Sequence, residues 1–316
     1  MRQAVNILML GGAKRVSMGR MLIEAGKALG LEVNLFSYEL TPEVPIAEIA
    51  RVIVGLRWGD PAILSDLHDV VEENRIDIIL PFLDRAVEVA ARYCASDGEC
   101  WTPGMDAAKA ALLFDKVESD SLFRQSGFPL PANAMSGNVE GRVIAKPRNG
   151  SASKGIRVLD RDEFLALKGS GEASGYLCQE YVENRAEYTV DCYVSTGGTF
   201  VCAVPRERLE VSGGEVSSTV TIHDEEMELE SRRILKTLDL RGASTLQFLR
   251  DKNTGRLMLM EINPRLGGGA VCSVHAGAAL PRFILADWLG EPLRECTDWA
   301  AGVKICRYPQ EVIFGK

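Results

Sequence analysis

The most restrictive feature of the sequence is an alternation of short apolar segments and amphipathic segments over its first hundred residues. Three apolar segments are typical of buried strands: AVNILML (4–10), LEVNLFSY (31–38) and IDIILPF (76–82). Between them, residues 18–30 and 59–75 have helical periodicity, and the second helix has Asp60 and Pro61 at its start. Strands separated by helices pair in parallel, with helices on both faces of the sheet. This pattern predicts a doubly wound α/β unit.

The pattern changes after the stretch CWTPGMD at residues 100–106, where Pro and Gly predict a domain boundary. Asp115 and Glu118 then form a capping-box-like start for a helix that ends at Gly127. The remaining chain is rich in strand-forming segments with short turns, interrupted by one helix near residues 225–238. Successive strands of this kind predict an antiparallel sheet, so the second part of the chain is expected to be α+β.

Charge and composition argue against several classes of partner. The chain has 316 residues, of which 46% are hydrophobic, and a formal net charge of -8. No long block of Lys and Arg is present, so no nucleic-acid partner is expected. No stretch approaches the roughly 20 apolar residues of a membrane span, and the N-terminus lacks a signal-peptide pattern, which predicts a cytoplasmic protein with no membrane partner. The eight cysteines form no CxxC pair and are expected to be reduced thiols.

The apolar segment LMLMEINPRLGGG (257–269) ends in a cluster of polar residues. Alternate side chains of a strand share one face, so Glu261 and Asn263 should project together while Met260 faces the other way. The preceding segment STLQFL joins it through a predicted hairpin, and either hairpin register puts Gln247 on the Glu261 face. Carboxylate and amide oxygens suit a hard cation such as Mg²⁺ with bound phosphate. The alternative interpretation is an exposed polar face of the sheet.

Two further features are candidates for contacts with phosphate. Arg265 follows Pro264 just past the strand end, where a guanidinium can bind a phosphate or an acyl phosphate through two hydrogen bonds. The loop KPRNGSASKG (146–155) follows an apolar strand, and its small residues allow backbone N–H groups to surround an anion. It does not match the P-loop pattern, and GGAKRVSMG (11–19) does not match the dinucleotide fingerprint. A solvated hairpin tip is the alternative for the loop.

Other reactive side chains give weaker signals. Arg206 and Arg208 share one strand face in VPRERLEV, and at least one of them is expected to point into a cleft rather than into solvent at a sheet edge. Cys272 lies three residues before His275, which is one arrangement of a nucleophile and its base. No orienting acid is evident, so a buried thiol is the favoured interpretation.

The order of these motifs is more specific than any one of them. Along the chain the order is DK (115–116) at a helix start, AKP (145–147) with its loop, QEYV (179–182), EYTVD (187–191), LQF (246–248) and EINPR (261–265). Together they resemble the ATP-grasp superfamily, and within it a single synthetase unit of the carbamoyl-phosphate synthase large subunit. The resemblance covers nearly the whole chain. It implies a Rossmann-like pre-ATP-grasp domain at residues 1–104, a central subdomain with a glycine-rich lid at 105–183, and a C-terminal subdomain with the metal site at 184–316.

The resemblance implies ATP as a cofactor, bound between the two subdomains of the grasp. The residues implied to contact it are Lys116, Lys146, Gly150, Ser151, Ser153, Gly155, Glu180, Tyr181, Val182 and Glu187. The lysines would neutralise the phosphates and the glycine-rich loop would close over them. The backbone of residues 180–182 would meet the adenine, and Glu187 would bind the ribose hydroxyls.

The resemblance also implies the metal and catalytic residues. Gln247, Glu261 and Asn263 would hold one or two Mg²⁺ ions, for which Mn²⁺ can substitute. The implied catalytic residues are Lys146 and Arg265, and the strand pattern adds Arg206 and Arg208 as further catalytic candidates. Arg265 would contact the transferred phosphoryl group, and residues 267–269 would let the acceptor substrate approach backbone amides.

The implied reaction is phosphorylation of a carboxylate by ATP, followed by attack of an amine or ammonia to form an amide. Because the chain holds one synthetase unit and no glutaminase segment, a stand-alone carboxylate–amine ligase for small molecules, expected to be a homodimer by default, is predicted. The alternative is an ATP-binding regulatory or scaffold module without turnover. Two departures from the family pattern concern the lid, which has Ala152 where glycine is common, and the residues after Asp84, which replace the usual Asp-x-Glu-Leu.

Overall fold

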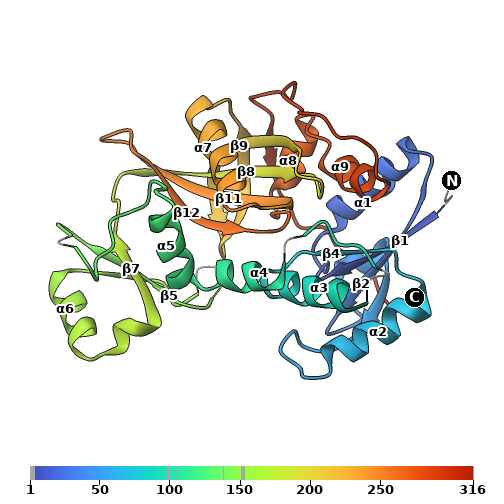
Figure 1. The fold of residues 1–316 in the computed structure, drawn as a ribbon, viewed down its shortest axis with the longest axis horizontal. Helices are drawn as coiled ribbons and strands as arrows, with labels where there is room; N and C mark the ends of the chain where they lie inside the picture. The colour runs from blue at the N-terminus through green and yellow to red at the C-terminus, as the bar shows by residue number, and fades with distance from the viewer. Residues whose placement is uncertain (1–3, 98–99, 105, 138, 151–153, 316) are drawn as a thin grey trace.

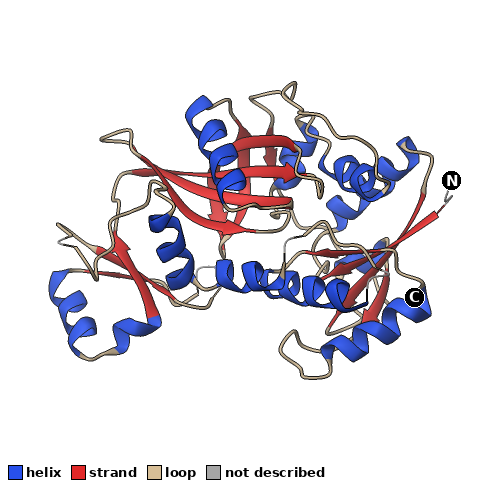
Figure 2. Cartoon of the chain, in the orientation of Figure 1, coloured by secondary structure: helices blue, strands red, loops and turns tan. Residues whose placement is uncertain are grey.

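The structure, a computed structural model, consists of three sheets with their helices (Figures 1 and 2). It describes residues 4–97, 100–104, 106–137, 139–150 and 154–315. The four-stranded, three-stranded and six-stranded sheets follow different parts of the chain, and the first and last residues described lie toward the same end of the molecule (Figure 1).

The N-terminal sheet has the order β3-β2-β1-β4, and all its strands are parallel. Its strands are β1 (Ala4–Leu10), β2 (Glu32–Glu39), β3 (Arg51–Val54) and β4 (Ile78–Pro81). Side chains of β1 alternate between two cores, with Val5, Ile7 and Met9 toward helix α1 (Val16–Ala28). Leu8 and Leu10 pack toward α2 (Ile63–Asn74) and α3 (Asp84–Asp97). Helices therefore cover both faces, as the sequence pattern predicts; β3 was not anticipated.

Two capped helices connect this sheet to the rest of the chain. Helix α4 (Ala107–Phe114) begins at Asp106, whose carboxylate accepts the N–H of Lys109. Helix α5 (Lys116–Gln125) begins at Asp115, whose carboxylate accepts the N–H groups of the second and third helical residues. Gly127 follows α5 with a φ of 68°, a left-handed conformation that glycine adopts readily at a helix end. This confirms the predicted start and end of α5.

The three-stranded sheet is small and antiparallel, with the order β6-β5-β7. Its strands are β5 (Val143–Pro147), β6 (Arg157–Leu159) and β7 (Tyr176–Glu180). Helix α6 (Arg161–Gly169) and the short turn η2 (Glu172–Gly175) lie between β6 and β7, and Phe164 and Leu167 of α6 pack into a separate small core. This sheet forms one end of the molecule in Figure 1.

The six-stranded sheet is antiparallel throughout, as the sequence predicts, with the order β12-β11-β8-β9-β10-β13. Its strands are β8 (Arg185–Val194), β9 (Phe200–Ser212), β10 (Glu215–Thr221), β11 (Gly242–Asp251), β12 (Leu257–Asn263) and β13 (Lys304–Cys306). Helix α7 (Glu225–Thr237) packs through Met227, Ile234 and Leu235 on the core beneath this sheet. Helices α8 (Ala270–His275) and α9 (Leu280–Trp288) follow β12.

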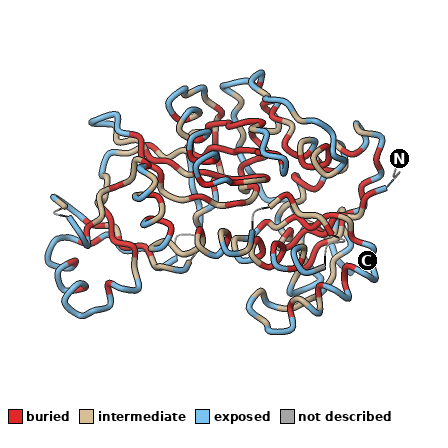
Figure 3. Tube along the Cα trace, viewed as in Figure 1, coloured by how far each residue is buried: buried red, intermediate tan, exposed pale blue. Residues whose placement is uncertain are grey.

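The largest core crosses the boundary predicted near residue 104. It combines β1, β2 and α1 with residues of β8, β9 and α9, including Tyr193, Leu280 and Ile284. Helices α1 and α9 lie side by side in Figure 1, and the buried segments of Figure 3 run through both regions. The N-terminal sheet is therefore packed directly against the end of the chain. Within the described residues, no helix is long and apolar enough to cross a membrane.

Candidate active site

A cleft of about 820 Å³ is lined by residues of the small and large sheets and by segments that connect the strands and helices of the N-terminal sheet. The loop after β4 lines one side, β5 and β7 of the small sheet line another, and β11 and β12 of the large sheet line the third. The site residues predicted from sequence that line it are Lys116, Lys146, Gly150, Glu180, Tyr181, Val182, Glu187, Arg208, Gln247, Glu261, Asn263 and Arg265. Gly155 and Arg206 do not line it, and Ser151 and Ser153 lie outside the described residues.

Three oxygen-bearing side chains meet where the middle of β11 pairs with the end of β12. Gln247 lies directly opposite Glu261 in the antiparallel pair, which agrees with the predicted parity of the hairpin. The Gln247 amide donates to Glu261 Oε1 over 2.7 Å, and the Asn263 amide donates to the same oxygen over 3.0 Å. Neither bond uses Glu261 Oε2 or the two amide oxygens. One carboxylate and two amides fit Mg²⁺ that also takes phosphate oxygens and water, since the patch supplies hard oxygen ligands but too little charge for a closed protein cage.

The predicted orientation of Met260 is wrong. The register shifts between Gln247 and Phe248, so Phe248 pairs with Leu259 and Met260 is an extra residue in β12. Such a bulge interrupts the alternation of side chains, and Met260 lines the cleft beside Glu261. The floor of the cleft therefore has an apolar residue next to the polar patch.

Lys146 of β5 is a buried cation that faces this patch across the cleft. It is 7% exposed, and its ammonium donates to Gln179 Oε1 over 3.0 Å. Gln179 in turn donates to Asp120 Oδ1 over 2.8 Å. Burial lowers the pKa of Lys146, while the charge of Glu261 opposes this shift and the nearby charge of Lys116 adds to it. Two neighbouring ammonium groups in a partly closed cleft favour binding of a polyanion.

The glycine-rich loop follows β5 and is also bonded to Lys116 at the start of α5. The Lys116 ammonium donates to the Gly150 carbonyl over 2.6 Å, which ties the start of α5 to the loop. Lys154, whose role the sequence left open, lines the cleft. Gly155 has a φ of 73°, which a residue with a side chain rarely adopts. Strands β5 and β6 on either side of the loop pair antiparallel.

Residues 180–187 cross from the small sheet to the large one along the cleft. The N–H groups of Glu180 and Tyr181 bond to carbonyls of neighbouring segments, and the Val182 carbonyl accepts from Arg185 over 3.0 Å. The Tyr181 ring lies beneath the guanidinium groups of Arg142 and Arg185, at 4.8 and 4.9 Å from its centroid. Backbone and ring are thus held in place at the edge of the cleft.

Arg208 points into the cleft, as predicted for at least one of the two arginines of β9. Its side chain is 10% exposed, its Nε has no hydrogen-bond partner among the described residues, and it lies 3.7 Å from Glu187. Burial lowers the pKa of Arg208, whereas Glu187 and Glu261 raise it. A buried donor without a partner lowers the stability of the fold, and a bound anion would supply the missing acceptor for this guanidinium.

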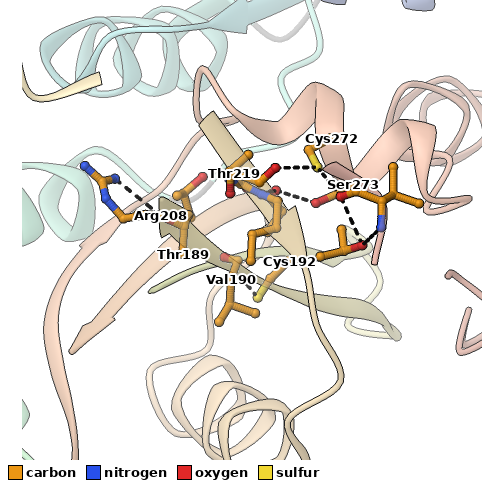
Figure 4. A network of polar contacts seen from close by, with 12 residues as sticks. Thr189, Val190, Cys192, Arg208, Thr219, Cys272 and Ser273 are labelled. Atoms are coloured by element: carbon orange, nitrogen blue, oxygen red, sulfur yellow. Dashed lines mark hydrogen bonds and ion pairs between the residues drawn. The ribbon is translucent and has the colours of Figure 1, made fainter. Parts of the chain in front are cut away.

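Arg206 is not a cleft residue, although the sequence analysis placed it among the catalytic ones. It is 1% exposed and forms a two-point ion pair with Asp191, at 2.7 and 3.1 Å. Ser273 also donates to Asp191, over 2.6 Å, and Thr219 accepts from Arg206. Both arginines lie on one strand face, but Arg206 meets the buried carboxylate of β8, which satisfies its charge. Figure 4 shows this network, with Arg208 extending away from it.

The same network contains Cys272, the candidate nucleophile. Cys272 is fully buried, and burial raises its pKa, so the thiol remains protonated. Its sulfur donates to the carbonyl of Thr219 (Figure 4) and to that of Val303. His275, by contrast, is exposed. These contacts favour the buried thiol over the nucleophile.

Arg265 is already paired in this structure. Its Nε and Nη2 donate to the two carboxylate oxygens of Asp84, over 2.6 and 3.1 Å. Asp84 is the first residue of α3 and also the first residue of the incomplete Asp-x-Glu-Leu pattern. The ion pair connects the N-terminal sheet to the strand end that carries the oxygen patch. A phosphoryl group at Arg265 therefore has to compete with Asp84 or use the remaining nitrogen.

The three glycines after Arg265 are explained by close packing of other side chains. A Cβ on Gly268 would lie 2.6 Å from Arg15 Nη1, and one on Gly269 would lie 2.7 Å from Arg206 Nη1. A Cβ on Gly267 would lie 3.2 Å from the Thr245 hydroxyl. The glycines thus make room for two arginines, a role that the sequence analysis did not foresee.

Sequence reasoning missed four residues of this site: Arg15, Asp84 as a partner of Arg265, Asp120 and Gln179. One signal was available for Gln179, because a lysine in a buried strand needs a polar partner on the strand beside it. The other contacts join segments that are distant along the chain and carry no local signal.

Comparison with known proteins agrees with this architecture. A family model described as "ATP-grasp in the biosynthetic pathway with Ter operon" matches residues 172–310. The carbamoyl phosphate synthase large chain of Thermotoga petrophila is 21% identical over 341 residues, covering 94% of this chain and 30% of the relative. The D-alanine–D-alanine ligase of Thermoanaerobacter sp. is 25% identical over 206 residues, covering 51% of this chain and 53% of the relative. The chain thus spans about a third of the length of the synthase relatives.

Two solved structures with a similar fold contain ADP. The biotin carboxylase domain of Hydrogenobacter thermophilus 2-oxoglutarate carboxylase, solved with MgADP, ADP and bicarbonate, matches 95% of this chain and 73% of its own, with a TM-score of 0.75 and 17% identity. N5-carboxyaminoimidazole synthetase from Staphylococcus aureus, solved with ADP, matches 93% of this chain and 80% of its own, with a TM-score of 0.74 and 14% identity. The chain is therefore similar in sequence to an ATP-grasp family model over residues 172–310 and to these synthases and ligases, and similar in fold to these ADP-bound enzymes.

Proposed function

We propose that this protein is an ATP-dependent ligase that activates a small-molecule carboxylate and couples it to an amine or ammonia. The carboxylate oxygen attacks the γ-phosphorus of ATP, giving an acyl phosphate and ADP. The amine then attacks the acyl carbon, loses a proton, and displaces inorganic phosphate. ATP and Mg²⁺ (or Mn²⁺) are the proposed cofactors.

The observation that carries this proposal is the meeting of three cations, one of them buried, and the oxygen patch in one cleft. Lys116, Lys146 and Arg208 come from three different elements, and the charge of Glu261 acts on both Lys146 and Arg208. Cations alone would suit many anions, and an oxygen patch alone would suit many metals. Their combination suits a nucleoside triphosphate with a bound divalent cation, held so that positioning and electrostatics supply the rate enhancement.

The proposed roles follow the geometry of the cleft. Lys116, Lys146 and Arg208 bind phosphate oxygens, and the loop at 146–155 covers them. The segment 180–182 meets the base and Glu187 the ribose. Gln247, Glu261 and Asn263 hold Mg²⁺, which supplies charge neutralisation between the phosphates when bound. Arg265 binds the transferred phosphoryl group after at least one of its two hydrogen bonds to Asp84 breaks.

We further propose the division into residues 1–104, 105–183 and 184–316, and assign a homodimer and a cytoplasmic location to the protein. A second candidate function is a nucleotide-binding regulatory or scaffold module. The ion pair between Asp84 and Arg265 favours it, because this pair occupies the group that should stabilise the transferred phosphoryl.

The two functions are separated by a product screen. Purified protein is incubated with ATP, Mg²⁺ and a cell-extract metabolite pool, and ADP release and new amide masses are recorded. Substitution Glu261→Ala should abolish both signals, since it removes the carboxylate of the patch; a loss of 10²-fold or more is expected for a group acting in the transition state. The matched control Glu226→Ala, on the exposed face of α7, should retain full turnover.

The two outcomes lead to opposite conclusions. Amide products that depend on Glu261 support the ligase. Tight Mg·ADP binding with no substrate-stimulated ADP release across the metabolite pool supports the regulatory module instead.

A further inference from the structure

Arg15 is a cleft residue whose charge is only partly used. It ends the loop GGAKR after β1, and its side chain is 11% exposed. Its Nη2 donates to Glu215 over 3.2 Å, whereas its Nη1 is buried and has no hydrogen-bond partner within the part of the chain that the structure describes. Burial lowers the pKa of Arg15, which reports the cost of holding this charge away from water. The group lines the same cleft as the candidate active site.

The backbone of the loop that carries Arg15 cannot serve as the anion site itself. In related folds, the turn after the first strand presents N–H groups to a phosphate. Here the N–H groups of Gly12 and Ala13 oppose the burial that raises the pKa of the Glu39 carboxyl, which also accepts from Ser37 over 2.7 Å. A carboxylate of the chain is thus already close to these backbone donors. An external anion has to be met by the Arg15 side chain.

The charges around Arg15 leave an excess of positive charge. Arg265 and Arg307 both act on Arg15, and Glu215 accepts from Arg307 as well as from Arg15. Asp84 is the carboxylate partner of Arg265. Within this group, three guanidinium groups face two carboxylates, so one positive charge is left over. The charges acting on Arg208 are instead Glu187, Arg206 and Glu261, and its Nη2 donates to the carbonyl of Gly214, next to Glu215.

Arg265 connects Arg15 to the oxygen patch. It follows β12, which carries the oxygen patch, and its charge acts on Arg15. A carboxylate phosphorylated at Arg265 would lie between the patch and Arg15. The absence of a side chain at Gly268 leaves room for Arg15, because a Cβ at that position would lie 2.6 Å from Arg15 Nη1. No side chain of residues 267–269 stands between the guanidinium and the reacting end.

We propose that Arg15 binds a second anionic group of the substrate, beyond the carboxylate that is phosphorylated. The substrate class is then a dianion, either a dicarboxylate or a carboxylic acid that carries a phosphate ester. The inference rests on the proposed function and adds to it the substrate class. Arginine suits this role because its planar fork binds carboxylate and phosphate through two hydrogen bonds.

The test is a calorimetric titration of the full chain, with and without saturating Mg·ADP. The probes are dicarboxylates of three to six carbons, 3-phosphoglycerate, and monocarboxylates of matched length. The unmodified protein should bind a dianion at least tenfold more tightly than the matched monoanion. Substitution Arg15→Gln should remove most of this preference, weakening the dianion by about 10- to 100-fold, as expected for a lost hydrogen bond to a charged group. Its Mg·ADP affinity should stay within twofold.

Three further variants keep the result interpretable. Arg20→Gln, an exposed arginine of the same helix, is the matched control and should bind every probe normally. Glu215→Gln should tighten dianion binding, because it removes the carboxylate that competes for Arg15. Arg15→Lys keeps the positive charge but lacks the planar guanidinium that forms two hydrogen bonds. If Arg15→Gln fails to fold, the same titration is made with Arg15→Lys, which should also lose most of the preference for the dianion.

Each outcome bears on one claim. Equal binding of monoanions and dianions, absence of binding by every probe, or equal effects of Arg15→Gln and Arg20→Gln would overturn the proposal. Whether dicarboxylates or 3-phosphoglycerate show the larger Arg15 effect identifies the second group as carboxylate or phosphate. Failure of the unmodified protein to bind Mg·ADP would contradict the proposed function, while leaving the anion titration without nucleotide intact.

Discussion

Single side chains in the cleft are held in costly states that a bound anion would relieve. Lys146 is buried next to the like charge of Lys116, and Arg208 has a buried donor without a partner in the described structure. Glu261 receives two amide donors on one oxygen. In a protein selected only for stability, such groups would be replaced or paired. Strongly perturbed groups gathered in one cleft are instead typical of functional sites.

The lowered pKa of Lys146 predicts a pH dependence of nucleotide binding. Burial makes its ammonium deprotonate below the ordinary pKa of 10.5, and the phosphates of Mg·ADP should favour the charged form again. Above the lowered pKa, binding should therefore take up a proton, and affinity should fall as the pH rises through that pKa. Calorimetry in two buffers of different protonation enthalpy measures this uptake. Lys146→Arg stays charged throughout, so equal proton uptake in that variant would assign the effect to another group.

Strands and helices were predictable where their signals are local. The alternation in β1, the apolar face of α2 and the cap of α5 all appear as expected, because each depends on residues close in sequence. The pairing of Gln247 with Glu261 was also accessible, since a hairpin preserves parity. The bulge at Met260 was not, because an extra residue in one strand leaves the composition of that strand unchanged.

The remaining differences arise between elements. Arg206 and Arg208 have the same parity, and only the position of Asp191 on the neighbouring strand decides which of them is buried. Asp84 and Arg265 are 181 residues apart, and their pairing depends on how the N-terminal sheet docks on the large one. Tertiary packing, rather than local propensity, determines these contacts.

One element contact predicts a large difference between two glycines of β11 and its hairpin. Gly242 and Gly255 have φ values of 72° and 77°, so alanine is strained at both by about 1–2 kcal/mol. A Cβ on Gly242 would also lie 1.2 Å from the Pro103 carbonyl oxygen, whereas nothing lies within 4 Å of a Cβ on Gly255. Gly242→Ala should therefore lower the free energy of unfolding by about 4 kcal/mol or more, well beyond Gly255→Ala. Urea denaturation measures both, and similar losses would mean that the segment at Pro103 yields easily.

At the scale of the whole molecule, the proposed nucleotide end and the proposed substrate end of the cleft are built differently. The nucleotide end lies between the small sheet and the large sheet, and the small sheet has its own core. The substrate end lies between the N-terminal sheet and the large sheet, which share one core. The small sheet is therefore the part that is freer to move, and the frame that holds Arg15 and Arg265 is the more rigid part.

This difference predicts which segments lose protection from hydrogen exchange after each of two matched core substitutions. Leu280 of α9 is 0% exposed in the shared core, and Leu167 of α6 is 4% exposed in the core of the small sheet. Each change to alanine should cost about 2–5 kcal/mol. In native-state hydrogen exchange, Leu280→Ala should reduce protection in β1 and α1 as well as in α9, because these segments pack on one another. Leu167→Ala should act on β5, β6 and β7 alone.

The exchange pattern also tests the proposed boundary at residue 104. Should β1 and α1 keep full protection in Leu280→Ala, residues 1–104 would be an energetically independent domain, and the shared core would contribute little to their stability. Joint loss in β1, α1 and α9 would instead make the N-terminal sheet and the end of the chain one cooperative unit. Arg15 would then be fixed relative to Arg265 before any substrate binds, and recognition of a second anionic group would require no domain movement beyond closure of the small sheet.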